Sequence, residues 1–234
     1  MLEEAKDMRK ATYLWRALVL AALVVMAVSA FAEVDPTVPL WRGSEGSTYQ
    51  KWSFDSEDNP AVLSSDPGLN PYGDPTAFVT VGDLGSGWQP NMGGFGTQTG
   101  LWDLGSLGTI SIDLPNRPYD GGFKELWISV VCFEDPGWMV APAVEVLCGG
   151  VISFLGEETY LVEEDSISGQ WNVRLTKWRI EPNPNSEHVL ITSDVFGSVI
   201  DRIEIDTICV PEPASFATLL MGGPFLLALR RRKA

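Results

Sequence analysis

Two tryptophans in glycine- and proline-rich stretches carry the clearest binding chemistry in this sequence. Trp88 lies in Gly-Ser-Gly-Trp-Gln-Pro and Trp138 in Asp-Pro-Gly-Trp-Met-Val, where core packing requires an aromatic ring less than it does within a strand. An exposed flat ring beside Asp, Asn or Gln can stack on a ligand while the polar groups bond its hydroxyls. We therefore expect Trp88 and Trp138 to bind a ligand; rings that only cap the core are the alternative.

Oxygen-bearing side chains alternate in the run Asp55-Ser-Glu-Asp-Asn59. Asp55, Glu57 and Asn59 have the spacing that opens a calcium loop. Pro60, however, occupies the position where an EF-hand needs glycine, and no glutamate closes the loop. These three residues are candidate ligands for a structural calcium ion, and a solvated acidic turn is the alternative. No other cofactor is expected.

Catalytic groups are sparse. The single histidine, His188, lies in a strand-like run, and no G-x-S-x-G motif supplies a nucleophilic serine. We therefore predict no catalytic residue. A carboxylate pair across a cleft, as in a glycoside hydrolase, is the alternative. The carboxylates on or beside expected strands are Asp103, Asp113, Glu125, Glu145 and Glu187.

Three cysteines are scattered along the chain and have no zinc-ligand spacing. Cys132 and Cys148 both fall on the apolar side of neighbouring segments. A Cys132–Cys148 disulfide is therefore a candidate if the two Cα atoms lie within ~7 Å. Pairings of either residue with Cys209 stay open.

Short strands must position these side chains. Residues 109–114 alternate cleanly, with Ile110, Ile112 and Leu114 inward. Residues 123–133 are apolar on both faces, which is typical of a central strand. The other expected strands are 48–54, 77–81, 100–103, 143–148, 151–155, 171–180, 188–192 and 199–210. Short strands between turn clusters, with no helical period, predict an all-β, antiparallel, jelly-roll-like β-sandwich.

Two local features refine this prediction. Gly149-Gly150 indicates a hairpin turn between 143–148 and 151–155. Residues 171–180 begin with odd positions apolar and end with even ones, which indicates a bulge near Thr176. Four tryptophans fall in expected strands and are assigned to the core; they are Trp52, Trp127, Trp171 and Trp178.

Residues 1–32 have the parts of a secretory signal peptide. The basic n-region contains Lys6, Arg9, Lys10 and Arg16. An apolar run at 17–28 follows, and Ala30-Phe-Ala32 has the small-x-small pattern of a cleavage site. We predict export and cleavage after Ala32, with a retained signal anchor as the alternative. The ectodomain is then 33–209.

The ectodomain is strongly acidic. Residues 33–209 hold 8 of the 16 basic residues and 27 of the 31 acidic ones, a net charge of −19 against −15 for the whole chain. A nucleic-acid partner needs basic residues that neutralise its phosphates, so this composition excludes one. Calcium and neutral or cationic glycans remain compatible with this charge.

Residues 210–234 have three consecutive parts. Pro211 and Pro213 hold Val210 and Glu212 in extended conformations. Residues 214–229 carry no charge and would form a helix of roughly 24 Å, somewhat short of a ~30 Å hydrocarbon core. A basic cluster follows that would stay cytoplasmic; it comprises Arg230, Arg231, Arg232 and Lys233.

In this order, Pro211-Glu212-Pro213, the apolar segment and the basic cluster resemble the PEP-CTERM sorting signal of Gram-negative bacteria. The resemblance implies recognition and processing by the membrane enzyme exosortase. It also implies anchoring in the inner membrane, facing the periplasm, before release to the cell surface or extracellular matrix. In that family the neighbouring material is extracellular polysaccharide. An ordinary C-terminal membrane anchor is the alternative.

A second resemblance concerns the ectodomain. Residues 49–55, 178–184 and the closing strand are similar to galactose-binding-like jelly rolls, which are often attached to such tails. We therefore predict an exported, surface- or envelope-associated protein whose ectodomain binds glycan or matrix without catalysis. A glycoside hydrolase-like enzyme and a purely structural envelope protein are the alternatives.

Overall fold

A computed structural model describes residues 35–64, 70–91, 96–117, 121–135, 137, 139–164 and 169–211. The chain divides into two units, Met1–Val38 and Pro39–Ala234. The described part of the first unit is a turn in which Val38 N–H donates to Asp35 O over 3.1 Å. No helix of the described ranges is long and apolar enough to cross a membrane.

The predicted signal peptide and most of the predicted sorting tail lie outside the described residues. These predictions concern the cleavage residues Ala30 and Ala32 and the tail residues Glu212, Pro213, Arg230, Arg231, Arg232 and Lys233. They stay predictions.

The described part of the second unit is built from strands. In chain order they are β1 (Ser47–Trp52), β2 (Thr76–Thr80), β3 (Gly87–Asn91), β4 (Thr99–Asp103), β5 (Thr109–Pro115), β6 (Phe123–Glu134), β7 (Ala143–Leu147), β8 (Val151–Glu164), β9 (Gln170–Glu181), β10 (Ser186–Thr192) and β11 (Val199–Val210).

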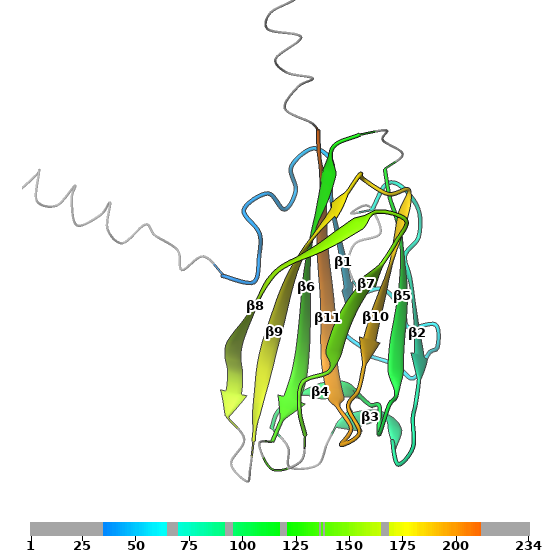
Figure 1. The fold of residues 1–234 in the computed structure, drawn as a ribbon. Coiled ribbons are helices and arrows are strands. Elements are labelled where there is room, and N and C mark those ends of the chain that lie inside the picture. Colours follow the sequence, from blue (N-terminus) through cyan, green and yellow to red (C-terminus); the bar gives the residue numbers. More distant parts are fainter. Residues whose placement is uncertain are drawn as a thin grey trace, which may run out of the picture. The chain divides into compact units, whose positions relative to one another are not determined.

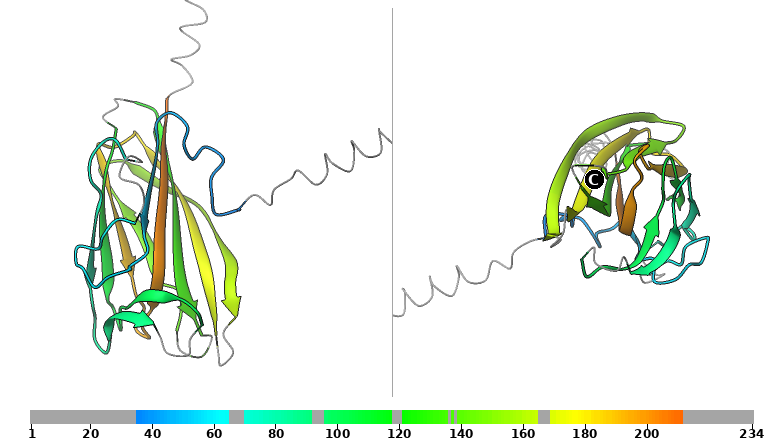
Figure 2. Two further views of the ribbon diagram at one scale, coloured as in Figure 1. Left: turned by 180° about the vertical axis from the view of Figure 1, so that it is seen from behind. Right: turned by 90° about the horizontal axis from the view of Figure 1, so that it is seen from below.

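Two antiparallel sheets face each other (Figures 1 and 2). The seven-stranded sheet has the order β3-β4-β11-β6-β9-β8, and β1 also pairs with β11. The four-stranded sheet has the order β2-β5-β10-β7. From β4 to β8 consecutive strands alternate between the sheets. The predicted all-β antiparallel sandwich is confirmed, and so is the central position of β6, between β11 and β9.

The main core lies between the sheets and follows from period-2 alternation. Ile110 and Ile112 on β5 are fully buried, as the sequence predicts, and they belong to one cluster with Leu126 and Ile128 on β6. Burying each such side chain contributes roughly 1.5–3 kcal/mol. This burial holds the two sheets together and fixes which residues of each strand point outward.

The predicted bulge near Thr176 is wrong. The β6–β9 register runs without interruption from Lys124↔Ile180 to Glu134↔Gln170. The apolar positions change parity because β9 is buried on both faces. Two of its odd positions, Trp171 and Val173, belong to a second cluster on the other side of the sheet. The irregularities lie instead in β8, at Phe154/Gly156 and Leu161/Glu163.

Two further expectations fail for a related reason. Gly149-Gly150 is no hairpin turn, because β7 pairs with β10 in the smaller sheet and β8 pairs with β9 in the larger one. Trp127 is half-buried on β6 and lies edge-on to Trp41, with ring centroids 6.2 Å apart. The local pattern identifies β7 and β8 as strands, but the sheet to which each belongs depends on partners far away in the sequence.

The Cys132–Cys148 disulfide does not form in this structure, where all three cysteines are free thiols. Cys132 pairs with Asn172 near the end of β6, whereas Cys148 follows Leu147, which pairs with His188. Gly150, two residues on, packs against Ile180, the partner of the second residue of β6. At about 3.3 Å per residue the two cysteines therefore sit toward opposite ends of β6.

Candidate ligand-binding cleft

A cleft of about 570 Å³ opens between the edge of the smaller sheet and the inner face of the larger one. One wall is β7 with the residues before it, and the other is formed by β8 and β9. The lining residues are Leu107, Ala141, Pro142, Ala143, Val144, Phe154, Glu157, Arg174, Thr176, Trp178, Thr192, Ser193 and Asp194. Because the sheets have four and seven strands, the smaller one leaves part of the inner face of β8 and β9 uncovered.

Two aromatic rings line the apolar part of the cleft. Phe154 on β8 and Trp178 on β9 are register partners, with ring centroids 4.9 Å apart and planes inclined at 59°. Trp178 Nε1–H donates to Thr176 Oγ1 over 3.0 Å, which fixes the indole orientation. The Phe154 side chain is 54% exposed, so this pair presents apolar ring surface to solvent.

A charged pair follows the rings along the same strands. Arg174 Nη2 forms an ion pair with Glu157, and Arg174 Nη1 donates to Thr159 Oγ1 over 3.0 Å. Both side chains of the ion pair remain partly exposed, at 30% for the arginine and 38% for the glutamate. The guanidinium is thus oriented by Glu157 and Thr159, and hydrogen-bonding groups of both signs remain open to the cleft.

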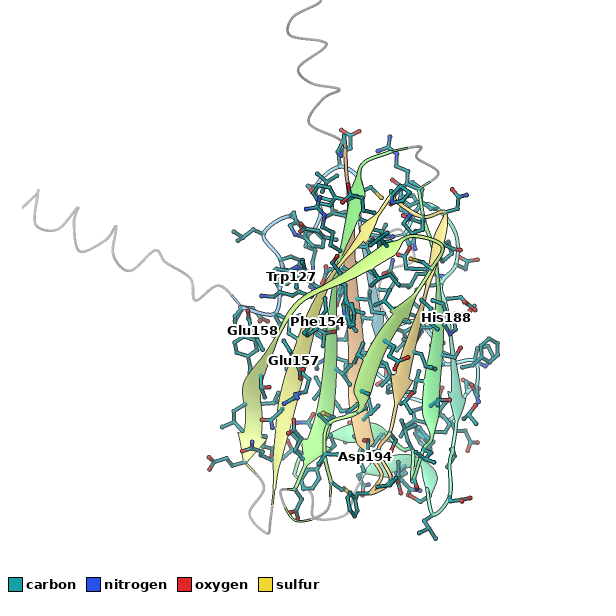
Figure 3. The ribbon with its side chains drawn as sticks, viewed as in Figure 1. Trp127, Phe154, Glu157, Glu158, His188 and Asp194 are labelled. Carbon is teal, nitrogen blue, oxygen red and sulfur yellow. The ribbon has the colours of Figure 1, made fainter. Side chains whose placement is uncertain are left out.

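Asp194 supplies a carboxylate at the far end of the cleft. It is exposed, and its Oδ1 accepts from the N–H of Val195. Its own carbonyl accepts from Gly197 N–H over 3.0 Å, which holds the turn that carries it. Figure 3 shows Phe154 and Glu157 on β8 and Asp194 on the turn after β10.

This arrangement combines an aromatic surface with separated donors and acceptors. One guanidinium and two carboxylates give the cleft no positive excess, so it has no strong attraction for an anion. A neutral ligand with one apolar face and several hydroxyls matches both parts of the cleft. Sugar rings have this character.

Trp88 does not line this cleft. It lies in β3, a strand that the sequence did not predict, and pairs with Trp102 on β4. The ring is half-buried against the main core, and its Nε1–H donates to Phe54 O over 2.8 Å. These contacts give Trp88 a packing role. Trp138 lies outside the described residues.

The candidate calcium ligands do not converge. Both amide atoms of Asn59 bond the backbone of Val79, at 2.7 and 2.9 Å. Asp55 is exposed and lines a separate pocket of about 410 Å³ with Asp58, and Glu57 is also exposed. Among the described residues no group of three or more His, Cys, Asp or Glu could hold a metal ion. A calcium ion at Asp55, Glu57 and Asn59 stays an untested prediction.

His188 lies between an aspartate and a serine, as the histidine of a Ser-His-Asp triad does. His188 Nδ1 lies 2.8 Å from Asp113 Oδ1, and Nε2 lies 3.4 Å from Ser111 Oγ. These residues are register neighbours on β5 and β10, on the face turned away from the core. The backbone groups of those strands are engaged in the sheet, so they supply no oxyanion-binding N–H groups. The arrangement lacks the remaining parts of an acyl-transfer site.

Sequence reasoning assigned Trp178 to the core and singled out none of Phe154, Glu157, Arg174 or Asp194. One signal was available in β9, whose even positions change from Ile180 and Trp178 to Thr176 and Arg174. A core face that becomes polar along one strand indicates that its covering layer ends there.

No protein-family model matches the sequence, and no curated protein does either. Solved structures similar to this one include carbohydrate-binding modules. CBM35 from Cellvibrio japonicus Abf62 is 13% identical with a TM-score of 0.28, covering 58% of this chain and 99% of that one. A Xyl-CBM35 in complex with a glucuronic acid-containing disaccharide is 14% identical with a TM-score of 0.27, covering 54% and 86%.

The module TmCBM27, described for specific mannan recognition, is 11% identical with a TM-score of 0.24, covering 53% of this chain and 86% of that one. Identities and scores this low leave the ligand chemistry to be argued from the side chains of the cleft.

Proposed function

We propose that the sandwich is a non-catalytic glycan-binding domain and that the cleft between β7 and β8–β9 is its binding site. The observation that carries the proposal is the Phe154–Trp178 ring pair beside the Arg174–Glu157 ion pair, on one face of an open cleft. A sugar ring would stack on the aromatic surface, and its hydroxyls would bond the charged groups.

The size and charge of the cleft support this ligand class. Its volume of about 570 Å³ falls within the range typical of small-molecule sites, roughly 300–1,000 Å³. The acidic excess of residues 33–209 disfavours polyanions. We therefore propose a neutral polysaccharide in preference to an acidic one.

A binding role is favoured over hydrolysis by the state of the carboxylates. The cleft is lined by two of them, Glu157 and Asp194. A glycosidase needs one carboxylic acid that can donate its proton to the leaving group. Glu157 is engaged in an ion pair with Arg174, so its carboxylate is bonded to a guanidinium and is not free to act on a leaving group.

We also propose that the protein is exported and sorted by its C-terminal segment. Val210 ends β11, and Pro211 directly after it is exposed. A tail that begins at Pro211 can therefore extend away from the strand without breaking a core contact. The proposed partners are exosortase, the inner membrane and, after processing, extracellular polysaccharide.

The binding proposal is tested by a glycan array on the purified protein, run with and without calcium. Trp178→Phe and Phe154→Ala should reduce the signal on any glycan that the wild type binds. Phe78→Ala is the matched control, since Phe78 is also a large exposed ring but lies on β2 of the smaller sheet. Binding that is unchanged in both cleft variants would rule out this site, and release of reducing sugar would favour the hydrolase alternative.

A further inference from the structure

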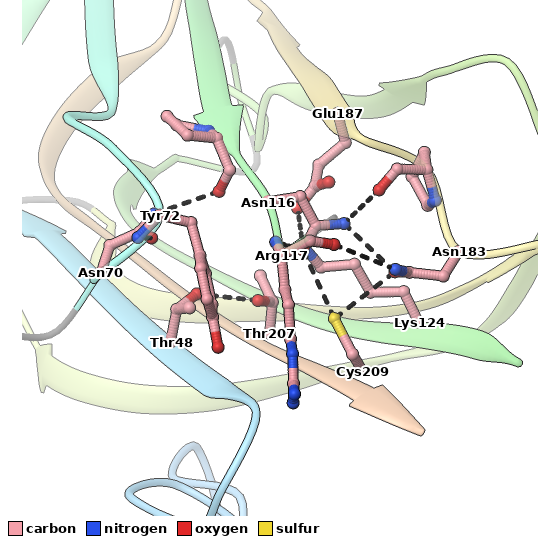
Figure 4. A network of polar contacts seen from close by, with 12 residues as sticks. Thr48, Asn70, Tyr72, Asn116, Arg117, Lys124, Asn183, Glu187, Thr207 and Cys209 are labelled. Atoms are coloured by element: carbon pink, nitrogen blue, oxygen red, sulfur yellow. Dashed lines mark hydrogen bonds and ion pairs between the residues drawn. The ribbon is translucent and has the colours of Figure 1, made fainter. Parts of the chain in front are cut away.

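A second constellation of polar groups is buried between the sheets, at the end where β6 begins. Lys124 on β6 has no exposed surface and forms an ion pair with Glu187 on β10, which is 2% exposed. Asn116 and Asn183 beside them are 4% and 7% exposed. Figure 4 shows these side chains together with Cys209. Burying an ion pair costs free energy of desolvation, so the placement requires an explanation.

The strand registers bring the amine close to an amide. Lys124 and Cys209 are direct partners on β6 and β11, which places their Cβ atoms roughly 4.5–5.5 Å apart. Cys209 Sγ lies 3.4 Å from Asn116 Oδ1. From the opposite sheet, Glu187 pairs with Leu114, two residues before Asn116. The side chains of Lys124, Glu187 and Asn116 therefore lie together at one buried end of the sandwich (Figure 4).

Hydrogen bonds fix the orientation of the Asn116 side-chain amide, whose carbonyl carbon would be the electrophile. Its Oδ1 accepts from Arg117 N–H over 2.8 Å. The Cys209 thiol lies 3.4 Å from Oδ1 of both Asn116 and Asn183. The Arg117 N–H, together with the thiol when it donates to this oxygen, would stabilise the negative charge that develops on Oδ1 when a nucleophile attacks the carbon. Its Nδ2 donates to Asn183 Oδ1 over 3.1 Å and to Pro184 O, which fixes the plane of the amide.

We propose that Lys124 and Asn116 form an intramolecular isopeptide bond, with Glu187 as the proton carrier. Glu187 takes a proton from the Lys124 ammonium, and the neutral Nζ attacks Cγ of Asn116. A C–N bond forms to Nζ and the bond from Cγ to Nδ2 breaks. Glu187 gives this proton to Nδ2, which leaves as ammonia, and takes up the second proton that Nζ loses on becoming an amide nitrogen, so Glu187 ends protonated. No oxidant, cofactor or water is consumed.

The environment of Glu187 suits this role. Burial raises the pKa of its carboxyl, while the charge of Lys124 acts in the opposite direction. A raised pKa brings the neutral amine–carboxylic acid state of the pair closer in free energy to the ion pair. Glu187 Oε2 is buried and has no hydrogen-bond partner among the described residues, so it can accept a proton from or donate one to the reacting amide.

The product would join the second residue of β6, in the larger sheet, to Asn116, the residue directly after β5 of the smaller sheet. All three thiols are free, so this link would take the place of a disulfide between the sheets. The reaction also replaces a buried charged pair by a neutral amide and a protonated Glu187. That change removes part of the desolvation cost noted above.

The test is the intact mass of the purified, reduced full-length or naturally processed chain. We expect a mass lower by one ammonia than the sequence requires, and a tryptic peptide that is branched between Lys124 and Asn116. Glu187→Gln keeps the size and polarity of the side chain but loses the proton carrier, so it should retain the full mass.

Three outcomes would overturn the proposal. The first is a wild-type chain with the full mass, cleaved by trypsin after Lys124. The second is loss of ammonia without a branched peptide, because cyclisation of Asn116 onto its own backbone also releases ammonia. The third is a branched peptide that joins Lys124 to Asn183 instead of Asn116. Asn183→Ser is the matched control, and this variant should keep the Lys124–Asn116 bond. The wild-type measurement decides even if Glu187→Gln fails to fold.

Discussion

Phe154 and Trp178 are direct partners on β8 and β9, and their ring centroids lie 4.9 Å apart at the uncovered edge of the larger sheet. In the middle of the sandwich such a cross-strand pair would be core. Here the smaller sheet ends before it reaches the pair, so one ring is more than half exposed. The difference in width between the sheets thus converts a packing motif into a candidate binding surface.

Removing an aromatic ring from this pair should weaken glycan binding. Phe154→Ala removes the exposed stacking surface, and we expect a loss of roughly 1–3 kcal/mol, by analogy with stacking of planar ligands on aromatic side chains. Isothermal titration calorimetry with the best array ligand measures it. Phe78→Ala on the smaller sheet should leave the affinity unchanged, and an equal loss in that control would contradict a local effect.

Glycan affinity should depend on the geometry of the Arg174–Glu157 pair and not only on its charge. Arg174→Lys keeps the charge but loses the planar fork that bonds Glu157 and Thr159 together. We expect weaker binding, at a cost of about 1 kcal/mol, close to the net contribution of one hydrogen bond. Thermal unfolding should change little, because both side chains are partly exposed. A loss of stability larger than the loss of affinity would assign this pair a structural role instead.

The second hydrophobic cluster should be a true part of the core. Trp171 is fully buried and lies against Phe133 with ring centroids 5.5 Å apart. Trp171→Ala should therefore lower the free energy of unfolding by about 3–5 kcal/mol. Trp127→Ala, on a half-buried ring of the same sheet, is the matched control and should cost less. Urea denaturation followed by circular dichroism measures both, and equal costs would count against a second core.

The strands that the sequence predicted are those whose pattern is local. Ile110, Ile112 and Leu114 alternate within a single segment, and the structure buries all three. β3 was missed because Gly87 and Pro90 indicate a loop, and β4 is its only partner among the described strands. Local pattern therefore identifies strands whose own side chains carry the core, and it fails for an edge strand that is held by its neighbour.

The cleft could not be predicted in this way because it depends on sheet assignment. Its walls come from β7 and from β8–β9, which are consecutive in the chain but belong to different sheets. A hairpin turn at Gly149-Gly150 would place β7 and β8 side by side in one sheet, and no cleft could then lie between them. The error arose because a glycine pair permits either a tight turn or a crossover, and long-range pairing with β10 and β9 decides between them.

A buried aspartate gives the fold a dependence on pH. Asp201 lies where the β11 register shifts and is 6% exposed. Burial raises its pKa from 3.8 to about 6; Arg202 and Lys51 act against the rise, and Asp55 adds to it. The folded state therefore binds this proton more tightly than the unfolded state does.

The sign of the effect follows from that difference. Well below pH 3.8 Asp201 is protonated in both states, so its ionisation does not lower the free energy of unfolding. As the pH rises from there to about 6 the unfolded chain ionises first, so the free energy of unfolding falls. Above this window the cost is complete, at roughly 2–3 kcal/mol from about 1.4 kcal/mol per pKa unit.

Asp201→Asn should therefore stabilise the protein at pH 8 by up to that amount and have little effect at pH 4. The gain should develop across the interval between the two pKa values, because the asparagine stays neutral throughout. Urea unfolding at several pH values measures it. The exposed Asp83→Asn is the control for a simple loss of negative charge from an acidic protein. A gain of the same size in both variants, or one that does not vary with pH, would show that ionisation of Asp201 is not its cause.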